Sequence, residues 1–375
     1  MIYVHVPFCH RKCTYCAFYS KPVGSGQWAV AGYVDAVLAE MEARRGEQAH
    51  PIRTVYFGGG TPSLLPIGEL GRIVDGLHRC FDLGRVEEMT LEANPEDLSP
   101  AYLAALRQMG FNRLSIGVQS LDDRELRMLN RRHTARQAAE AVENARAAGF
   151  GNVSVDFIYG IGDIGETGDA GTVEALLSAV THVSAYSLTV EEGTALAVQV
   201  GQGRVALPDE DEVVRQYYEL RRRLTAAGFA QYEVSNYARP GYESRHNSRY
   251  WDRTPYLGLG PAAHSFDGSR RRWNVSSVEE YCKGMAGAAG SPVPPVFQEE
   301  TLTEADALNE LLMTSLRTVR GLPVAAVPDG YKERLHRGMQ PYVDCGWVVF
   351  GDGSYRPTAE GLLHADGMAA ALFVA

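Results

Sequence analysis

Residues 9–16 read Cys9-His10-Arg11-Lys12-Cys13-Thr14-Tyr15-Cys16, which places three cysteines at the spacing C-x3-C-x2-C close behind an N-terminal strand signal. Three thiolates this close together can hold one inorganic cluster, but they cannot pair among themselves without leaving one over. Cubane iron–sulfur clusters take cysteine thiolates, normally four, so a loop of three leaves one iron open to a ligand that is not protein. The spacing therefore favours an iron–sulfur cluster held by Cys9, Cys13 and Cys16.

A structural zinc site is the alternative, and the spacing alone leaves it open. Zinc needs a closed shell of four ligands, such as three cysteines and a histidine, and His5 or His10 is near enough in sequence to be the fourth. Zinc sites are usually built from a C-x2-C pair that meets a second pair elsewhere. The remaining cysteines, Cys80, Cys282 and Cys345, are scattered and supply no such pair.

The composition of the 375-residue chain is that of an ordinary globular protein, with 45% hydrophobic and 22% charged residues. A net charge of −10 argues against bulk affinity for nucleic acid or for anionic membranes. The cysteine pattern does not indicate a disulfide framework, and neither a signal peptide nor a long apolar run is evident. We therefore expect a cytoplasmic protein.

Strand and helix signals alternate through the first half of the chain. Strands are predicted at residues 2–6, 54–57, 88–92, 113–118, 153–159 and 182–188, and helices at 27–45, 67–80, 100–109, 122–129 and 136–148. Such alternation is typical of βαβ units and a parallel sheet in an α/β protein. Eight strands would close a full barrel, whereas six are visible, so we predict a partial (β/α)6 TIM-like barrel.

The pattern predicts three regions. Residues 1–207 form the barrel, and residues 208–290 extend it with a long helix at 209–227 and an irregular stretch at 231–274. A linker rich in glycine and proline at 284–295 leads into a small α+β region at 291–375. Its helices at 304–317 and 359–372, with a strand at 347–350, are compatible with a winged helix.

Residues that can do chemistry follow the ends of the predicted strands, where α/β barrels carry their sites. The cysteine loop follows the first strand, Gly58-Gly59-Gly60-Thr61-Pro62 follows the second, and Glu92 ends the third. Gln119 ends the fourth strand, with Arg131 further on, and Asp156 interrupts an apolar strand where an unpaired acid is costly. Each residue alone could be a turn glycine, a satisfied core residue or a loop residue, but their shared register indicates a ligand site.

These motifs resemble the radical SAM superfamily and, within it, the oxygen-independent coproporphyrinogen III oxidase-like branch. The resemblance covers nearly the whole chain and is carried by Tyr3-x-His5-x-Pro7-Phe8-Cys9, Gly59-Gly60-Thr61-Pro62, Glu92-Ala93-Asn94-Pro95, Gly117-Val118-Gln119-Ser120, Asp156-Phe157-Ile158-Tyr159-Gly160, Ser184-Ala185-Tyr186-Ser187-Leu188, Tyr232-Glu233-Val234-Ser235-Asn236, Arg245-His246-Asn247-x-x-Tyr250-Trp251 and Leu316-Arg317-Thr318.

The resemblance implies a fold, two cofactors and a set of contacts. It implies a barrel of the radical SAM type, a [4Fe–4S] cluster on the three cysteines, and S-adenosylmethionine on the open iron. The residues that it assigns to S-adenosylmethionine or its neighbourhood are Tyr3, Gly59, Gly60, Thr61, Glu92, Gln119, Arg131 and Asp156. Glycine backbone suits the methionyl end, Glu92 and Asp156 can accept from amine or ribose hydroxyl groups, and Arg131 can bind a carboxylate.

Two members of this branch compete. One is the dehydrogenase that decarboxylates two propionates of coproporphyrinogen III to vinyl groups; it carries a longer arm ahead of the loop and a fourth cysteine where Phe18 stands here. The other is a heme chaperone, whose H-N-x-x-Y-W motif is matched from His246 to Trp251. The resemblance therefore favours a heme carrier that delivers heme to an acceptor protein, with membrane contact only through that acceptor; the dehydrogenase is the alternative.

His246 is the expected ligand to heme iron, because imidazole suits iron. The alternative is that His246 only bridges loops through hydrogen bonds. His264 is a second candidate ligand. Arginines that could pair with the porphyrin propionates are Arg245, Arg249 and Arg270–Arg272.

Overall fold

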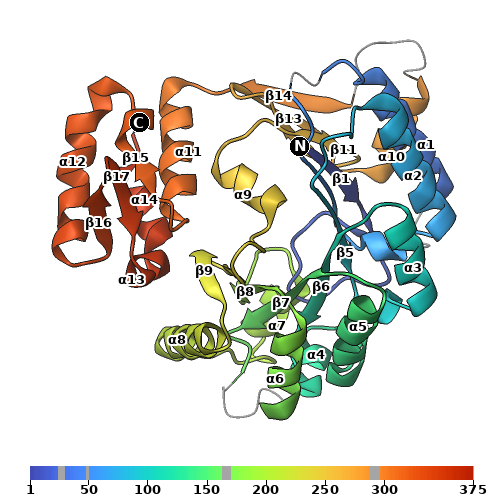
Figure 1. Cartoon of the computed structure of the whole chain (residues 1–375), viewed down its shortest axis with the longest axis horizontal. Helices are drawn as coiled ribbons and strands as arrows, with labels where there is room; N and C mark the ends of the chain where they lie inside the picture. The colour runs from blue at the N-terminus through green and yellow to red at the C-terminus, as the bar shows by residue number, and fades with distance from the viewer. Residues whose placement is uncertain (24–29, 48–49, 163–169, 288–295, 375) are drawn as a thin grey trace.

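The main body of the protein is a nine-stranded sheet with helices over its outer face, as Figure 1 shows for a computed structural model that describes residues 1–23, 30–47, 50–162, 170–287 and 296–374. The strand order is β11-β1-β4-β5-β6-β7-β8-β10-β9, and the six strands from β1 to β8 are parallel neighbours. The predicted α/β fold, a partial barrel of six parallel strands, is confirmed.

The six central strands are β1 (Ile2–Val6), β4 (Thr54–Gly59), β5 (Glu88–Ala93), β6 (Arg113–Gln119), β7 (Asn152–Tyr159) and β8 (His182–Ser187). The helices among them are α1 (Val30–Ala43), α2 (Ile67–Cys80), α3 (Pro100–Gln108), α4 (Asp123–Met128), α5 (Ala135–Ala147) and α6 (Ala170–Ala179), with single turns η1 (Pro62–Leu64) and η2 (Pro95–Asp97). Local signals set several boundaries; Thr134 and Gln137, for example, form a capping box at the start of α5. The predicted helix start at Gln27 lies outside the described residues.

The edges of this sheet come from residues 230–259. Strand β11 (Leu257–Leu259) pairs in parallel with β1, while β10 (Asn236–Ala238) is antiparallel to β8 and to β9 (Ala230–Glu233). Helix α9 (Arg245–Trp251) lies between these edge strands in sequence. The expectation of an irregular stretch at 231–274 was therefore wrong, because elements of three to seven residues are too short to show a periodicity.

The two faces of the barrel strands differ in chemistry. Val4, Phe57 and Leu91 point outward into the apolar core beneath the helices and are fully buried. The inward face is polar, because the register aligns Tyr3, Tyr56, Thr90 and Arg113 in one layer and Glu92 with Ser115, Ser154 and His182 in the next. The interior is therefore suited to polar ligands rather than to a packed apolar core.

The rest of the second half comprises helices, an outer ribbon and a separate C-terminal core. Helices α7 (Ala195–Gly201), α8 (Glu210–Ala226) and α10 (Val278–Gly287) join the barrel, and β12 (His264–Phe266), β13 (Arg270–Asn274) and β14 (Phe297–Thr301) form an antiparallel ribbon. A short parallel pair, β2 (Phe8–Cys9) and β3 (Lys21–Pro22), flanks the cysteine loop. No helix in the described ranges has both the length and the apolarity that a membrane span requires.

The C-terminal region packs around its own apolar cluster, which includes Leu308, Leu312 and Met339. Its elements are α11 (Glu304–Leu316), β15 (Leu322–Pro323), η4 (Val324–Ala326), α12 (Asp329–Asp344), β16 (Val348–Gly351), β17 (Ser354–Pro357), α13 (Ala359–Leu363) and α14 (Ala365–Leu372). The single helix expected at 359–372 is broken at His364, whose ring stacks on Trp347 at 3.8 Å. The winged-helix assignment and the division after residues 207 and 290 stay predictions, and residues 288–295 lie outside the described ranges.

Candidate functional site

The C-terminal ends of the barrel strands surround one cavity of about 730 Å³. Every residue predicted for the cluster and for S-adenosylmethionine lines this cavity except Tyr3, whereas the candidate heme ligands His246 and His264 do not. The predicted residues that line it are Cys9, Cys13, Cys16, Phe18, Gly59, Gly60, Thr61, Glu92, Gln119, Arg131 and Asp156. Residues far apart in the sequence thus meet at one place because parallel strands present all their C-terminal ends at the same rim.

The three cysteines all have free thiols. The hydroxyl of Thr61 donates to Cys9 Sγ at 3.4 Å, and the guanidinium of Arg131 donates to Cys13 Sγ at 3.5 Å. Donors of this kind stabilise sulfur in its thiolate form, which is the form that binds metal. Three unpaired thiols around a cavity of this size, two of them with donors in place, fit a cluster held by three cysteines.

The cysteine loop is held in place by hydrogen bonds of Thr14. The backbone N–H of Thr14 donates to Leu129 O at 3.2 Å and its hydroxyl to Met128 O at 3.1 Å, and Leu196 N donates to Thr14 O at 2.8 Å. The loop is thereby attached to the end of α4 and the start of α7, so the helices that follow β6 and β8 position the thiols.

The two histidines considered for a zinc site are engaged elsewhere. Both ring nitrogens of His5 have partners, Tyr3 Oη at 3.1 Å and Tyr19 O at 3.0 Å. His10 is on the outer side of the loop, 3.7 Å from Asp97. Within the described parts of the chain, no three His, Cys, Asp or Glu side chains are grouped so as to hold a single metal ion.

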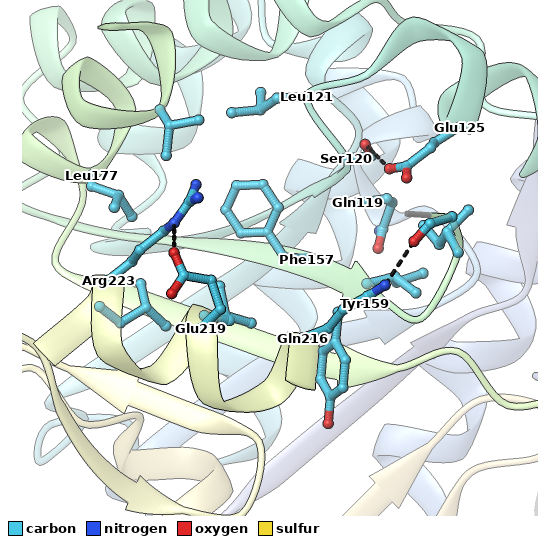
Figure 2. A pocket seen from close by; sticks show the side chains of 16 residues that line it. Gln119, Ser120, Leu121, Glu125, Phe157, Tyr159, Leu177, Gln216, Glu219 and Arg223 are labelled. Carbon is cyan, nitrogen blue, oxygen red and sulfur yellow. Dashed lines mark hydrogen bonds and ion pairs between the residues drawn. The ribbon is translucent and has the colours of Figure 1, made fainter. Parts of the chain in front are cut away.

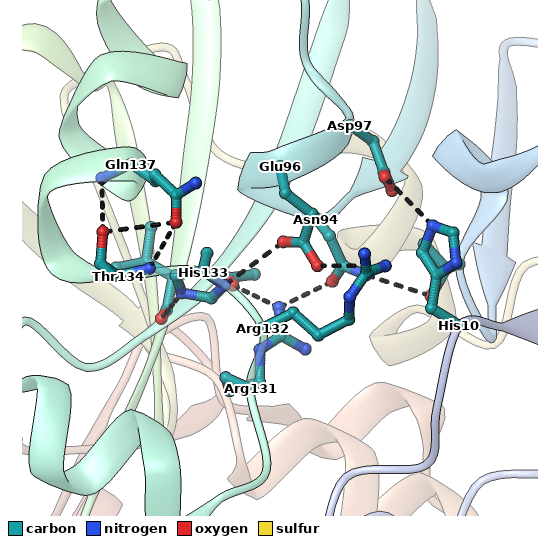
Figure 3. Close-up of polar contacts among 12 residues, drawn as sticks. His10, Asn94, Glu96, Asp97, Arg131, Arg132, His133, Thr134 and Gln137 are labelled. Atoms are coloured by element: carbon teal, nitrogen blue, oxygen red, sulfur yellow. Dashed lines mark hydrogen bonds and ion pairs between the residues drawn. The ribbon is translucent and has the colours of Figure 1, made fainter.

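Arg131 lines the cavity and is held by several partners. Its Nη2 donates to Asn94 Oδ1 and to Gly117 O, both at 2.7 Å, while its buried Nε has no hydrogen-bond partner among the residues that the structure describes. Figure 3 shows this arginine beside Asn94, with Glu96 close to the ring of His133. A fixed guanidinium with an unused donor suits a carboxylate such as that of S-adenosylmethionine.

Glu92 is held by two donors at the cavity wall. Tyr56 Oη donates to its Oε1 at 2.8 Å and Gly59 N to its Oε2 at 3.1 Å. Burial first, and the nearby charge of Asp156 as well, raise the pKa of Glu92 to about 7. Gly59 has φ +109°, and a side chain there would lie 2.5 Å from the ring of His5, so only glycine fits.

Asp156 lies on β7, two strands along the sheet from Glu92, with β6 between them. Its carboxylate accepts from Ser115 Oγ at 3.2 Å, and burial raises its pKa. Two partly buried carboxylates near a guanidinium provide acceptors for an ammonium group or for sugar hydroxyls, which is the donor set that S-adenosylmethionine presents. The residues present therefore fit that ligand as well as the cluster.

Gln119 lines both this cavity and a smaller one of about 110 Å³ that Figure 2 shows in close-up. Its φ of +67° is unusual for a residue other than glycine. The small cavity lies against the outer face of β7, where Phe157 and Tyr159 contact α8, and the ion pair of Glu219 with Arg223 lies on its far wall. Gln119 ends β6, and together with Ile158 of β7 it lines both cavities.

Tyr3 lies inside the barrel, whereas Phe18 follows the cysteine loop and lines the cavity. Tyr3 is deeper in the barrel, where its ring stacks on Tyr56 at 6.2 Å, so it contacts the residue that holds Glu92 and not the cavity itself. Phe18 is 72% exposed at the mouth of the cavity. Neither residue adds a polar group to the cavity wall.

His246 lies at the opposite end of the barrel from the cysteines. Its side chain is fully buried; Nδ1 shares a hydrogen bond with Thr54 Oγ1 at 2.9 Å and Nε2 with Tyr250 Oη at 3.1 Å. Its backbone N–H donates to Glu88, which begins β5 about 13 Å below Glu92 at the usual rise per residue. Helix α9 therefore closes the N-terminal end of the barrel, and in this structure neither ring nitrogen of His246 is available to a ligand.

Several residues of the cavity wall were not among those predicted from the sequence. Asn94, Ser115 and Tyr186 line the cavity, as do Thr189 and Glu191 from the loop after β8. The rule that located Glu92 and Gln119, polar residues at strand ends, would also have indicated this loop because it follows the sixth strand.

The chain matches two described families. The family model described as "Radical SAM superfamily" matches residues 3–169, and the model described as "HemN C-terminal domain" matches residues 302–364. The heme chaperone HemW of Mycobacterium tuberculosis is 42% identical over 360 residues, which cover 94% of this chain and 91% of that protein. The radical S-adenosyl methionine domain-containing protein 1, mitochondrial, of Bos taurus is 40% identical over 331 residues, which cover 86% of this chain and 74% of that protein.

Among solved structures, that of the coproporphyrinogen III oxidase HemN from Escherichia coli, a radical SAM enzyme, superposes with a TM-score of 0.83. The match covers 100% of this chain and 89% of that one at 22% identity, so it concerns the fold. Fold and site together define a radical SAM protein of the coproporphyrinogen III oxidase-like branch. Within that superfamily the chain belongs to the family of the heme chaperone HemW.

Glu92→Gln is predicted to change how stability depends on pH. A folded-state pKa of about 7, above the ordinary value of 4.5, means that wild-type stability falls as pH rises from 4.5 through 7. The neutral amide removes that loss, so relative to wild type the variant gains up to about 3 kcal/mol between pH 5 and pH 8. Urea unfolding of wild type and variant, both without the cluster, at pH 5 and pH 8 measures the difference. The same change in the free energy of unfolding at the two pH values would contradict a raised pKa of Glu92.

His246→Ala is predicted to lower the free energy of unfolding by about 2–4 kcal/mol, because it leaves buried hydroxyl groups of Thr54 and Tyr250 without a partner. Tyr250→Phe removes only one of these hydrogen bonds and is expected to have about a third of that effect. Denaturant unfolding of the three proteins is the measurement, and unchanged stability of His246→Ala would show that α9 does not close the barrel through this residue.

Proposed function

We propose that this protein is a heme chaperone that carries a [4Fe–4S] cluster and S-adenosylmethionine, binds heme and delivers it to an acceptor protein. The observation that carries the proposal is a sequence identity of 31–42%, over most of the chain, to several proteins named heme chaperone HemW. The single cavity lined by the three cysteines and the strand-end residues supports the cofactor part of the proposal.

Cys9, Cys13 and Cys16 would hold the cluster. Arg131 would bind the carboxylate of S-adenosylmethionine, while Glu92 and Asp156 would accept hydrogen bonds from its amine or its ribose. When bound, the cluster and S-adenosylmethionine supply one-electron chemistry. The chain's own contribution is to position both and to shield them below the mouth at Phe18.

The alternative is coproporphyrinogen III dehydrogenase. Its support is the likeness to HemN, which at 22% identity is one of fold. Against it, Phe18 stands where the fourth cysteine of that enzyme's motif would be, and of the other cysteines two are buried and Cys345 is in the C-terminal region. We therefore assign no decarboxylation to this chain.

The proposed setting is the cytoplasm, with heme and its acceptor protein as the partners. The net charge of −10 gives no support for a nucleic-acid partner. Any membrane contact of the protein would pass through the acceptor.

Anaerobic reconstitution with iron and sulfide tests the cofactor part. Wild type is expected to bind about four irons per chain with brown absorbance, because three thiolates suffice for the cubane. The triple variant with Cys9, Cys13 and Cys16 changed to Ala is expected to bind none, whereas Cys345→Ala, an exposed cysteine away from the cavity, keeps the full amount. Iron retained by the triple variant would contradict the proposal.

Heme titration of the reconstituted protein tests the carrier part. Saturable binding of one heme per chain is expected, with no vinyl product when coproporphyrinogen III, S-adenosylmethionine and a reductant are incubated with the protein. Vinyl product above the level of the cysteine triple variant would favour the dehydrogenase instead.

A further inference from the structure

The cysteine loop has two sides with different chemistry. Its three cysteines line the cavity, whereas the residues between Cys9 and Cys13, which are His10-Arg11-Lys12, do not line it and are exposed. Lys12 directly precedes Cys13 in the chain. The outer side of the loop therefore presents cations to the surroundings at one to three residues from two of the thiols.

A second cationic segment lies against this side of the loop. Arg11 Nη2 donates to Arg131 O at 3.3 Å, and Asn130 Nδ2 donates to Lys12 O at 2.8 Å, so the loop runs along the segment that follows α4. Further exposed arginines flank this contact at both ends. The exposed cations of this surface, which we call the basic patch, are Arg11, Lys12, Arg127 and Arg132.

The basic patch differs in charge from the rest of the chain. The whole chain has 36 lysine and arginine residues against 46 acidic ones, whereas residues 10–12 and 122–136 together have seven against three. Each of these three acidic side chains already accepts a hydrogen bond from a neighbouring residue. A local excess of positive charge is therefore present on a chain that is negative as a whole.

Most cations of the basic patch are not neutralised within the protein. Among the residues that the structure describes, Arg11, Lys12 and Arg127 have no carboxylate within 4 Å, and Arg132 is 4.0 Å from Glu96, as Figure 3 shows. Exposed charges of one sign that lack internal partners attract a surface of the opposite sign and accelerate its association. The basic patch is therefore suited to an acidic partner.

The position of the basic patch indicates what that partner supplies. One-electron chemistry on a cluster needs an electron from outside the chain, and the proposed S-adenosylmethionine would occupy the inner side of the loop, in the cavity. A partner on the outer side would lie beside the thiols without competing for that space. An anionic membrane or a nucleic acid would use the charge of the basic patch but not its place at the cysteines.

On the basis of the proposed cluster and its one-electron chemistry, we infer that the basic patch docks a small acidic protein that carries a one-electron group, either a flavin or an iron–sulfur cluster. One electron leaves this carrier, which is oxidised, and passes across the loop to the cluster on Cys9, Cys13 and Cys16, which is reduced. No covalent bond forms or breaks. Because the contact is between exposed charges, salt weakens it.

The test variant is Lys12→Glu/Arg127→Glu, which reverses two charges of the basic patch. Neither side chain has a hydrogen bond or an ion pair to another described residue, so the loop keeps its internal contacts. The matched control, Arg85→Glu/Arg337→Glu, changes the net charge by the same amount elsewhere. Arg85 lies in the turn before β5, at the opposite end of the strands from the cysteines, and Arg337 is exposed on α12.

The probes are a flavodoxin and a plant-type [2Fe–2S] ferredoxin, which are both acidic. Their affinity for each reconstituted protein is measured by calorimetry, and the rate of cluster reduction by stopped flow under anaerobic conditions. At low salt, the patch variant is expected to bind and to be reduced at least about tenfold more weakly and more slowly than wild type, whereas the control stays within about twofold. The advantage of wild type is expected to shrink as salt is raised.

Dithionite, a small reductant that needs no docking surface, provides the reference. It is expected to reduce the cluster equally in wild type, patch variant and control, and equal iron content shows that the loop is intact in all three. A wild type that holds no cluster, or one that dithionite does not reduce, would contradict the cofactor part of the proposed function instead.

Three results would overturn the inference while leaving the proposed function in place. The first is equal affinity and rate for wild type and the patch variant; the second is an equal loss in the control. The third is failure of both carriers to bind wild type while vesicles of anionic lipid bind it through the basic patch, which would assign this surface to a membrane.

Discussion

The parallel pairing of six strands determines where every group of the cavity lies. It brings the ends of β1, β4, β5, β6, β7 and β8 to one rim, so three thiols, a guanidinium and two carboxylates from distant parts of the sequence meet around one cavity. The same register turns Tyr56, Glu92 and Ser115 inward. The polar interior of the barrel follows from this strand pairing.

The interior has two ends with different roles. At the upper end, Glu92 is shared between Tyr56 and Gly59 at the cavity wall. At the lower end, Glu88 and Thr54 hold His246 of α9, and the ring of Tyr56 lies 5.0 Å from that of His246. Tyr56 thus contacts the groups at both ends. The motif histidine contributes to closing the barrel.

The sequence was sufficient for the barrel and for most of the cavity, for a physical reason. Strands of five to eight residues with regular alternation are visible in a single sequence, and the strand-end rule then locates Cys9, Glu92, Gln119 and Asp156. The burial of His246 could not be predicted, because a segment rich in Tyr, Arg and Asn has the composition of an exposed loop. Only the tertiary contacts with Thr54 and Glu88 show that α9 is enclosed.

Transfer of heme is the most direct test of the claim that this chain is a carrier rather than a decarboxylase. The protein with its cluster rebuilt is loaded with heme under anaerobic conditions, mixed with an apo heme protein, and separated from it, and the porphyrin in each fraction is identified by mass. Chemically unchanged heme is expected to move to the acceptor. Heme that stays on the chain, or a tetrapyrrole that has lost carboxyl groups, would contradict that claim.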